Sequence, residues 1–187
     1  MADARIDRLF DLPPEGFTAA RDELAGELRE AGERGAAGEI KGLRRPTVPA
    51  WAVNQLARRH RAEVQELLAV AQELRDAQRS ALSGRGAERL AEVGARRRHV
   101  VDGLVGRAGS LLEEAGRATS RPTLDRVADT LRAASMDQEA AEAVGRGRLE
   151  RELAPPSGFE AALVAGPVTR KPKGDGKARQ RAERAER

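Results

Sequence analysis

Trp51 and the polar residues near it have the types and spacing that suit recognition of a partner molecule. On a helical wheel Trp51 shares one face with Asn54, Arg58 and Arg61, and two more arginines precede it in the chain. Tryptophan and arginine are enriched at binding hot spots, and together they can stack on bases and contact phosphates. The sequence therefore predicts a candidate binding surface made of Arg44, Arg45, Trp51, Asn54, Arg58 and Arg61.

The same segment permits a structural interpretation, in which the N-terminal helices pack on this side and bury Trp51. The chain has one tryptophan, three phenylalanines and no tyrosine, and so scarce an aromatic residue is usually needed in the core. Phe10 or Phe17 would then help to cover the indole ring. We favour this second interpretation and keep the exposed surface as its alternative.

The C-terminal residues carry the excess positive charge of the chain. Residues 166–187 hold eight of the 34 basic residues and three of the 30 acidic ones, so this segment carries +5 and the rest of the chain −1. A basic tail binds polyanions without sequence preference through release of counterions. A solubilising tail or a linker is an equally good interpretation. The candidate polyanion contacts are Arg170, Lys171, Lys173, Lys177, Arg179, Arg181, Arg184 and Arg187.

Residue patterns that support catalysis or metal binding are missing from the sequence. The two histidines, His60 and His99, have no glutamate or histidine at helical metal-ligand spacing. His60 falls on an apolar stripe and is interpreted as a packed or rim histidine. The segment from Lys173 to Lys177 resembles a phosphate-binding loop, but the first glycine and the final serine or threonine of that motif are absent. We expect no enzyme activity, no cofactor and no metal.

Arg97 lies in the densest basic cluster outside the tail, at residues 96–99. The helical pattern directs it into an apolar stripe. It is expected either to extend past the hydrophobic seam to solvent or to pair with an acid on a neighbouring helix, such as Glu73, and we favour the pair. The cluster alone is weak support for nucleic-acid binding, because no groove-reading motif accompanies it.

Apolar residues recur at three- and four-residue spacing along most of the chain, which predicts an all-α fold. Thr47, Ser120 and Asp137 stand where N-caps are expected. The longest pattern is a helical hairpin with arms at about residues 49–82 and 87–115 and a turn between them. So short a connection makes the two arms antiparallel.

The predicted fold is a helical bundle of five to seven helices built on this long antiparallel helical hairpin. The N-terminal helices should pack on its Trp51 side, and helices between residues 120 and 153 should cover its other end. Residues 1–156 then form one helical bundle domain. Residues 157–187 are predicted to be a linker and a basic disordered tail, because they are polar and interrupted by proline and glycine.

The composition of the chain also indicates in which cellular compartment the protein is expected. The chain has no cysteine, which excludes disulfides and thiolate sites. The first ten residues lack the apolar region of a signal peptide, and no apolar run approaches the roughly 20 residues of a membrane span. We therefore expect a cytoplasmic protein without membrane contact.

Two stretches carry a resemblance to a known family, LPPEGFTAARD at residues 12–22 and IKGLRRPTVPAWAVN at residues 40–54. They resemble an uncharacterised family of all-helical proteins from high-GC actinobacteria, a family without an assigned function. The resemblance extends to about Pro156. Members often have longer charged helical C-termini, so the chain resembles a short member. The resemblance implies a helical fold and no site residues.

The sequence favours a non-enzymatic binding module whose basic tail contacts nucleic acid or another polyanion while the bundle contacts protein. The alternative is a helical protein–protein interaction or coiled-coil scaffold without a nucleic-acid role, in which the helices pair with a second copy or with another protein. An enzyme would require His60, Arg97 and a carboxylate to meet in one cavity.

Overall fold

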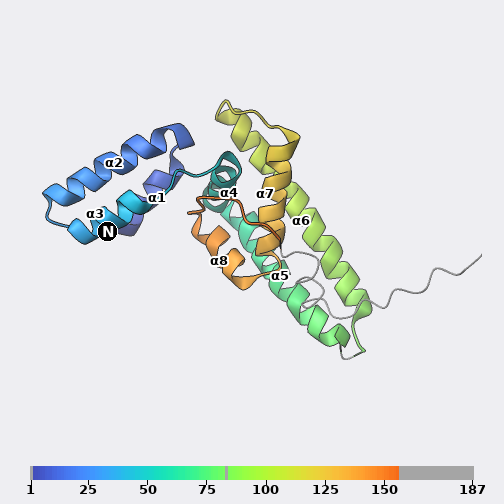
Figure 1. The fold of residues 1–187 in the computed structure, drawn as a ribbon. Coiled ribbons are helices and arrows are strands. Elements are labelled where there is room, and N and C mark those ends of the chain that lie inside the picture. The colour runs from blue at the N-terminus through green and yellow to red at the C-terminus, as the bar shows by residue number, and fades with distance from the viewer. Residues whose placement is uncertain (1, 83, 156–187) are drawn as a thin grey trace, which may run out of the picture. The chain divides into compact units, whose positions relative to one another are not determined.

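The structure is a computed structural model that describes residues 2–82 and 84–155. Within these residues it contains eight α-helices and no strand, which confirms the all-α prediction (Figure 1). The helices are α1 (Ala2–Asp11), α2 (Pro14–Glu30), α3 (Arg34–Gly42), α4 (Val48–Arg59), α5 (Arg61–Leu82), α6 (Ala87–Glu114), α7 (Arg121–Ala134) and α8 (Gln138–Arg146). The predicted linker and tail lie outside the described residues. None of the eight helices is long and apolar enough to cross a membrane.

Three of these helices begin at the residues predicted to cap them. The Oγ1 atom of Thr47 accepts a hydrogen bond from the amide of Ala50 at 3.3 Å, at the start of α4. Ser120 and Asp137 do the same for α7 and α8. Each cap satisfies one of the amides that a helix leaves unpaired at its N-terminus, so local chemistry fixes these starts.

The predicted first arm of the hairpin is not one helix. It breaks at His60, whose φ of −121° and ψ of 43° end α4, and α5 begins at the next residue. The cause is packing, because α4 is buried on nearly every side from Pro49 to Leu56, whereas α5 buries one stripe. To bury these different surfaces, the axes of α4 and α5 must point in different directions. This break contributes to a count of eight helices, where five to seven were predicted.

Helices α5 and α6 lie side by side and run antiparallel (Figure 1). Val70 and Leu74 of α5 pack with Val93 of α6 near the loop that joins the helices. Ion pairs line the seam in antiparallel order, from Glu73–Arg89 at 2.7 Å near the loop to Glu63–Arg107 at 4.0 Å toward the other end. Exposed pairs of this kind contribute about 0–1 kcal/mol each, so the apolar seam dominates the stability of the helix pair.

The buried residues form two main clusters. The central core is formed by the five helices from α4 through α8 and contains the side chains of Trp51, Leu56, Leu67, Leu104 and Leu131. A smaller core lies within α1, α2 and α3, where Phe10 and Phe17 meet edge to face with ring centroids 5.2 Å apart. Hydrogen bonds and ion pairs of Gln55, Arg58 and Arg117 are among the contacts that join α1–α3 to the rest of the body.

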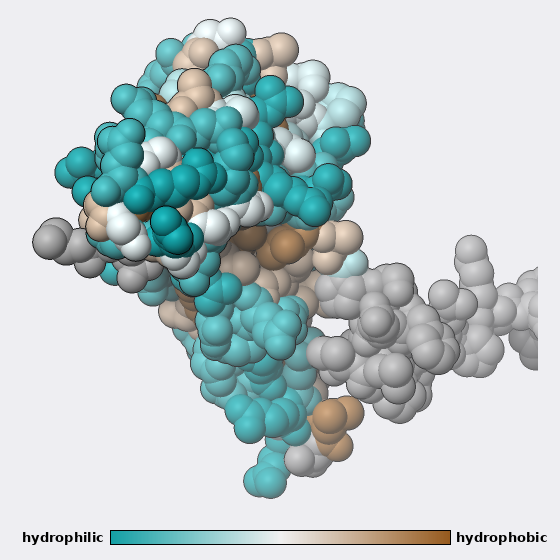
Figure 2. All heavy atoms as spheres, turned by 60° about the vertical axis from the view of Figure 1, so that its left-hand side comes forward, coloured by the Kyte–Doolittle hydropathy of each residue, from teal (hydrophilic) through white to brown (hydrophobic). Residues whose placement is uncertain are grey.

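The surface of the described residues is largely hydrophilic, as Figure 2 shows for one face. Among the large hydrophobic side chains described, Leu12 and Leu82 are exposed, and Leu82 at the end of α5 is 67% exposed. Single exposed leucines are normal on soluble domains and do not by themselves mark a docking site.

Candidate functional site

Trp51 does not lie on an exposed surface. Its side chain is 3% exposed and belongs to the central core, so the burial interpretation is confirmed and the exposed-surface hypothesis is wrong at this residue. The ring is covered by Arg117, whose guanidinium lies 5.5 Å from the ring centroid and forms an ion pair with Glu15 of α2. Phe10 and Phe17 belong to the N-terminal core instead. Trp51 thus helps to join α2 to the central core.

Asn54 is also buried and has a structural role, so it is a second error in the exposed-surface hypothesis. Its side-chain amide donates to the carbonyl of Leu149 at 2.9 Å and accepts from the amide of the same residue at 2.8 Å. The adjacent Gln55 donates to the carbonyls of Phe10 and Asp11 at 3.3 Å. The two neighbouring amides therefore hold the chain after α8 and the end of α1.

Arg58 of α4 is half-buried, and its hydrogen bonds connect α4 to α1 and to the C-terminal end of α8. Its guanidinium donates to the carbonyl of Gly147 at 2.8 Å and to that of Asp7 at 3.1 Å, and it pairs with the Asp7 carboxylate at 3.7 Å. Burial lowers the pKa of Arg58, and the nearby charge of Asp7 opposes that shift. Asp7 also accepts from Arg148 at 2.8 Å, and this bond lowers the pKa of Asp7. Arg58 is thus committed to internal contacts.

The remaining three residues of the predicted surface, Arg44, Arg45 and Arg61, are exposed. Arg44 and Arg45 lie in the loop between α3 and α4, whereas Arg61 is the first residue of α5. The backbone amide of Arg44 donates to the carboxylate of Glu150 at 2.8 Å, which places an acid beside this loop. The structure therefore separates the six predicted residues into a buried group and an exposed group. The eight candidate residues of the tail lie outside the described part of the chain.

His60 and His99 lie near a shallow hollow of about 250 Å³ between α5 and α6, lined by Glu63, His99 and Arg107 among others. His60 Nδ1 lies 3.3 Å from the Glu63 carboxylate, at the rim of the fold. The pKa of Glu63 is lowered first by its own backbone amide and then by His60. Among residues 2–82 and 84–155, no three His, Asp or Glu side chains are arranged to hold a metal ion.

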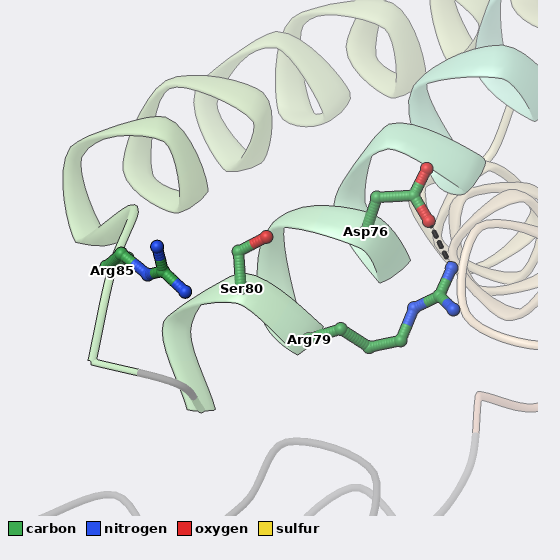
Figure 3. Close-up of a pocket in the computed structure, with 4 residues that line it drawn as sticks. All are labelled: Asp76, Arg79, Ser80 and Arg85. Carbon is green, nitrogen blue, oxygen red and sulfur yellow. Dashed lines mark hydrogen bonds and ion pairs between the residues drawn. The ribbon is translucent and has the colours of Figure 1, made fainter.

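A second hollow, of about 570 Å³, lies at the far end of the α5–α6 pair. Figure 3 shows its lining residues Asp76, Arg79, Ser80 and Arg85. Asp76 and Arg79 form an ion pair, and Arg85 extends toward Ser80, whose hydroxyl oxygen points away from it. The lining therefore combines two arginines, one carboxylate and one hydroxyl, and one of the arginines is already paired with that carboxylate.

Arg97 lies half-buried on α6, near α7. The predicted pair with Glu73 is wrong, because Glu73 binds Arg89 and Arg96 at 2.7 and 3.1 Å. Within the described chain Arg97 has no acidic partner at ion-pair distance. Burial lowers the pKa of its guanidinium, and the charges of Arg98 and Arg132 lower it further. The favoured prediction of a pair with Glu73 therefore fails, and the half-buried Arg97 fits the alternative better, a side chain that extends past the hydrophobic seam to solvent.

Sequence reasoning missed Arg117 as a structural residue. Its partners Trp51 and Glu15 precede it by 66 and 102 residues, so no local pattern connects them. We expect Arg117→Met to lower the free energy of unfolding by about 1–2 kcal/mol, because the cation over the indole ring is lost. Near-ultraviolet circular dichroism of Trp51 should change in the folded variant.

Arg121→Met is the control for this prediction, since Arg121 is 92% exposed and lies close by in the chain. It should change the unfolding free energy by less than about 0.5 kcal/mol. Equal effects of the two substitutions would show that the contact between Arg117 and Trp51 contributes nothing.

The described contacts thus assign Trp51, Asn54, Arg58 and Arg117 to the internal structure of the body, whereas Arg44, Arg45 and Arg61 are exposed. Comparison of the chain with protein-family models, with curated proteins and with solved structures finds no match in any of the three. Its function is therefore inferred from its own residues.

Proposed function

We propose that this protein is a non-enzymatic binding module, in which the basic tail contacts nucleic acid or another polyanion while the helical body contacts protein. The distribution of charge carries this proposal. Residues 166–187 carry +5, whereas the rest of the chain carries −1. Long-range attraction for a polyanion therefore comes mainly from the tail.

The ion pairs of the body support this division of roles. Arg96 pairs with Glu66 at 3.5 Å and Arg126 with Glu152 at 3.1 Å, and similar pairs occur throughout the described helices. A paired arginine contributes little to the field beyond a Debye length, about 8 Å at physiological salt. In this proposal α5 and α6 are the long hairpin on which the bundle is built, and their charged outer faces are available to a protein partner.

The test replaces charges in the full chain. A variant with Arg170, Lys171, Lys173 and Lys177 changed to glutamine is titrated with a labelled mixed-sequence DNA duplex at several salt concentrations. We expect the affinity at low salt to fall at least about tenfold, and the slope of log K against log salt to fall by as much as about 3.6. Fluorescence anisotropy measures both quantities.

The matched control has four exposed arginines of α1–α3 changed to glutamine, namely Arg5, Arg8, Arg29 and Arg34, so that the net charge falls equally. This variant should retain most of the affinity and the salt slope. Equal losses in the two variants, or binding that ignores salt, would contradict a role for the tail. If the wild-type chain binds neither DNA nor RNA but sediments as a stable dimer, the helical interaction scaffold is the better assignment.

A further inference from the structure

Three arginine side chains gather where α6 and α7 lie side by side. Residues 94, 97 and 98 share one face of α6, and the Arg98 Nη1 atom lies 3.9 Å from the position that a Cβ atom would take at Gly94. The Arg98 side chain therefore lies back along the helix beside Arg97.

Helix α7 contributes the third arginine. The short connection between α6 and α7 makes them antiparallel, and Leu124 of α7 lies 4.0 Å from the Cβ position of Gly109 on α6. Eight residues further along α7 is Arg132, which this register places opposite residue 101, about one helical turn from Arg97. The charges of Arg98 and Arg132 are both close enough to Arg97 to lower its pKa.

The acids near this cluster leave it with excess positive charge. Asp129 accepts from Arg132 at 2.8 Å, which neutralises one of the three guanidinium groups. Arg97 has no acidic partner among the described residues although it is half-buried. A partly desolvated cation beside two like charges is unfavourable unless an anion is present. The arrangement lacks an anionic partner.

We propose that Arg97, Arg98 and Arg132 form a binding site in the helical body for a phosphate group, separate from the tail. The planar guanidinium group donates two parallel hydrogen bonds to phosphate oxygens and stays charged at any physiological pH. Because the charges come from two helices that pack together, the site is held in place by the fold. The phosphate group belongs either to a small polyphosphate or to the backbone of a nucleic acid, since both present the same chemistry.

The first experiment locates the ligand on the full chain by phenylglyoxal modification of arginine, read by peptide mass spectrometry. Inorganic tripolyphosphate is the probe in one arm and a DNA duplex in the other. We expect at least about fivefold slower modification of Arg97, Arg98 and Arg132 in at least one arm, a difference of the size that one good charged contact produces. Arg121 lies on α7 outside the cluster and should keep its rate.

The second experiment separates binding from structure with the variant Arg97→Met, which keeps the apolar stem and removes the charge. Where tripolyphosphate protects the cluster, it should raise the Tm of the wild-type chain by about 5 °C or more at roughly a hundred times its Kd. In Arg97→Met that rise should disappear, while the Tm without ligand stays equal or increases. A purely structural arginine would give the opposite result, a lower Tm without ligand.

Protection by tripolyphosphate assigns the site to free polyphosphates, and protection by DNA alone assigns it to a nucleic-acid backbone, for which the shift in Tm is measured with the duplex. The proposal is overturned if neither probe protects the three arginines more than Arg121, or if Arg97→Met keeps the full shift in Tm. These readouts are specific to residues of α6 and α7. They remain valid if the tail proves not to bind polyanions.

Discussion

Replacement of Asn54 by leucine is expected to lower the free energy of unfolding by about 2–4 kcal/mol. The side chain is fully buried and exchanges two hydrogen bonds with the backbone of Leu149, at 2.9 and 2.8 Å. Leucine has nearly the same size as asparagine but cannot form a hydrogen bond with either the carbonyl or the amide of Leu149. An amide and a carbonyl would then be buried without partners, each at a cost of about 1–3 kcal/mol. Urea unfolding followed by circular dichroism measures the loss.

Gln72→Leu is the control, because Gln72 is an exposed residue of α5 that bonds only to neighbours on its own turn and the next. Its unfolding free energy should change by less than about 0.5 kcal/mol. Hydrogen exchange gives a second measurement, since the amide of Leu149 should lose its protection in Asn54→Leu. A loss of stability below about 1 kcal/mol would mean that water replaces the side chain and that the segment after α8 is held by other contacts.

The second large effect is expected for Arg58→Met, with a loss of about 2–4 kcal/mol in the free energy of unfolding. The variant keeps the apolar stem but leaves the carbonyls of Gly147 and Asp7 without their donor. Hydrogen bonds to a charged donor contribute about 1.5–3 kcal/mol each, more than neutral ones. The measurement is again denaturant unfolding, at fixed pH and salt.

Arg59→Met provides the matched comparison at the next residue. Arg59 is 53% exposed and pairs with Glu114 at 3.5 Å, so its loss should cost less than about 1 kcal/mol. The double variant of Asn54 and Arg58 should be less unstable than the sum of the two single variants, because both residues hold the segment from Gly147 to Leu149. Strict additivity would show that the two residues act independently.

Local chemistry explains which parts of the fold were predictable. The caps at Thr47, Ser120 and Asp137 depend on residues within one helical turn, and each was correct. The break at His60 was not predicted, because the apolar pattern continues through it. Its cause is the nearly complete burial of α4, which involves helices far along the chain.

The candidate site failed for a related reason. Trp51 and Arg58 are residue types enriched where one protein binds another, but such residues serve equally well where parts of one chain meet. A helical wheel gives the face that they share and not what covers that face. The partners of Asn54 and Arg58 lie up to 95 residues away, at Leu149 and Gly147. Their distance along the sequence is the reason that no spacing rule revealed them.

The segment after α8 also has a consequence for how the protein is made. The hydrogen-bond partner of Asn54 lies 95 residues later in the chain. Thr47 bonds to Glu152, 105 residues later, and Asp7 bonds to Arg148, 141 residues later. Contacts between residues so far apart in the sequence form slowly, and during translation the second residue of each pair leaves the ribosome well after the first. A nascent chain that ends before residue 147 lacks the partners of Asn54 at Leu149 and of Arg58 at Gly147, so the body is completed only after the segment that follows α8 has been made.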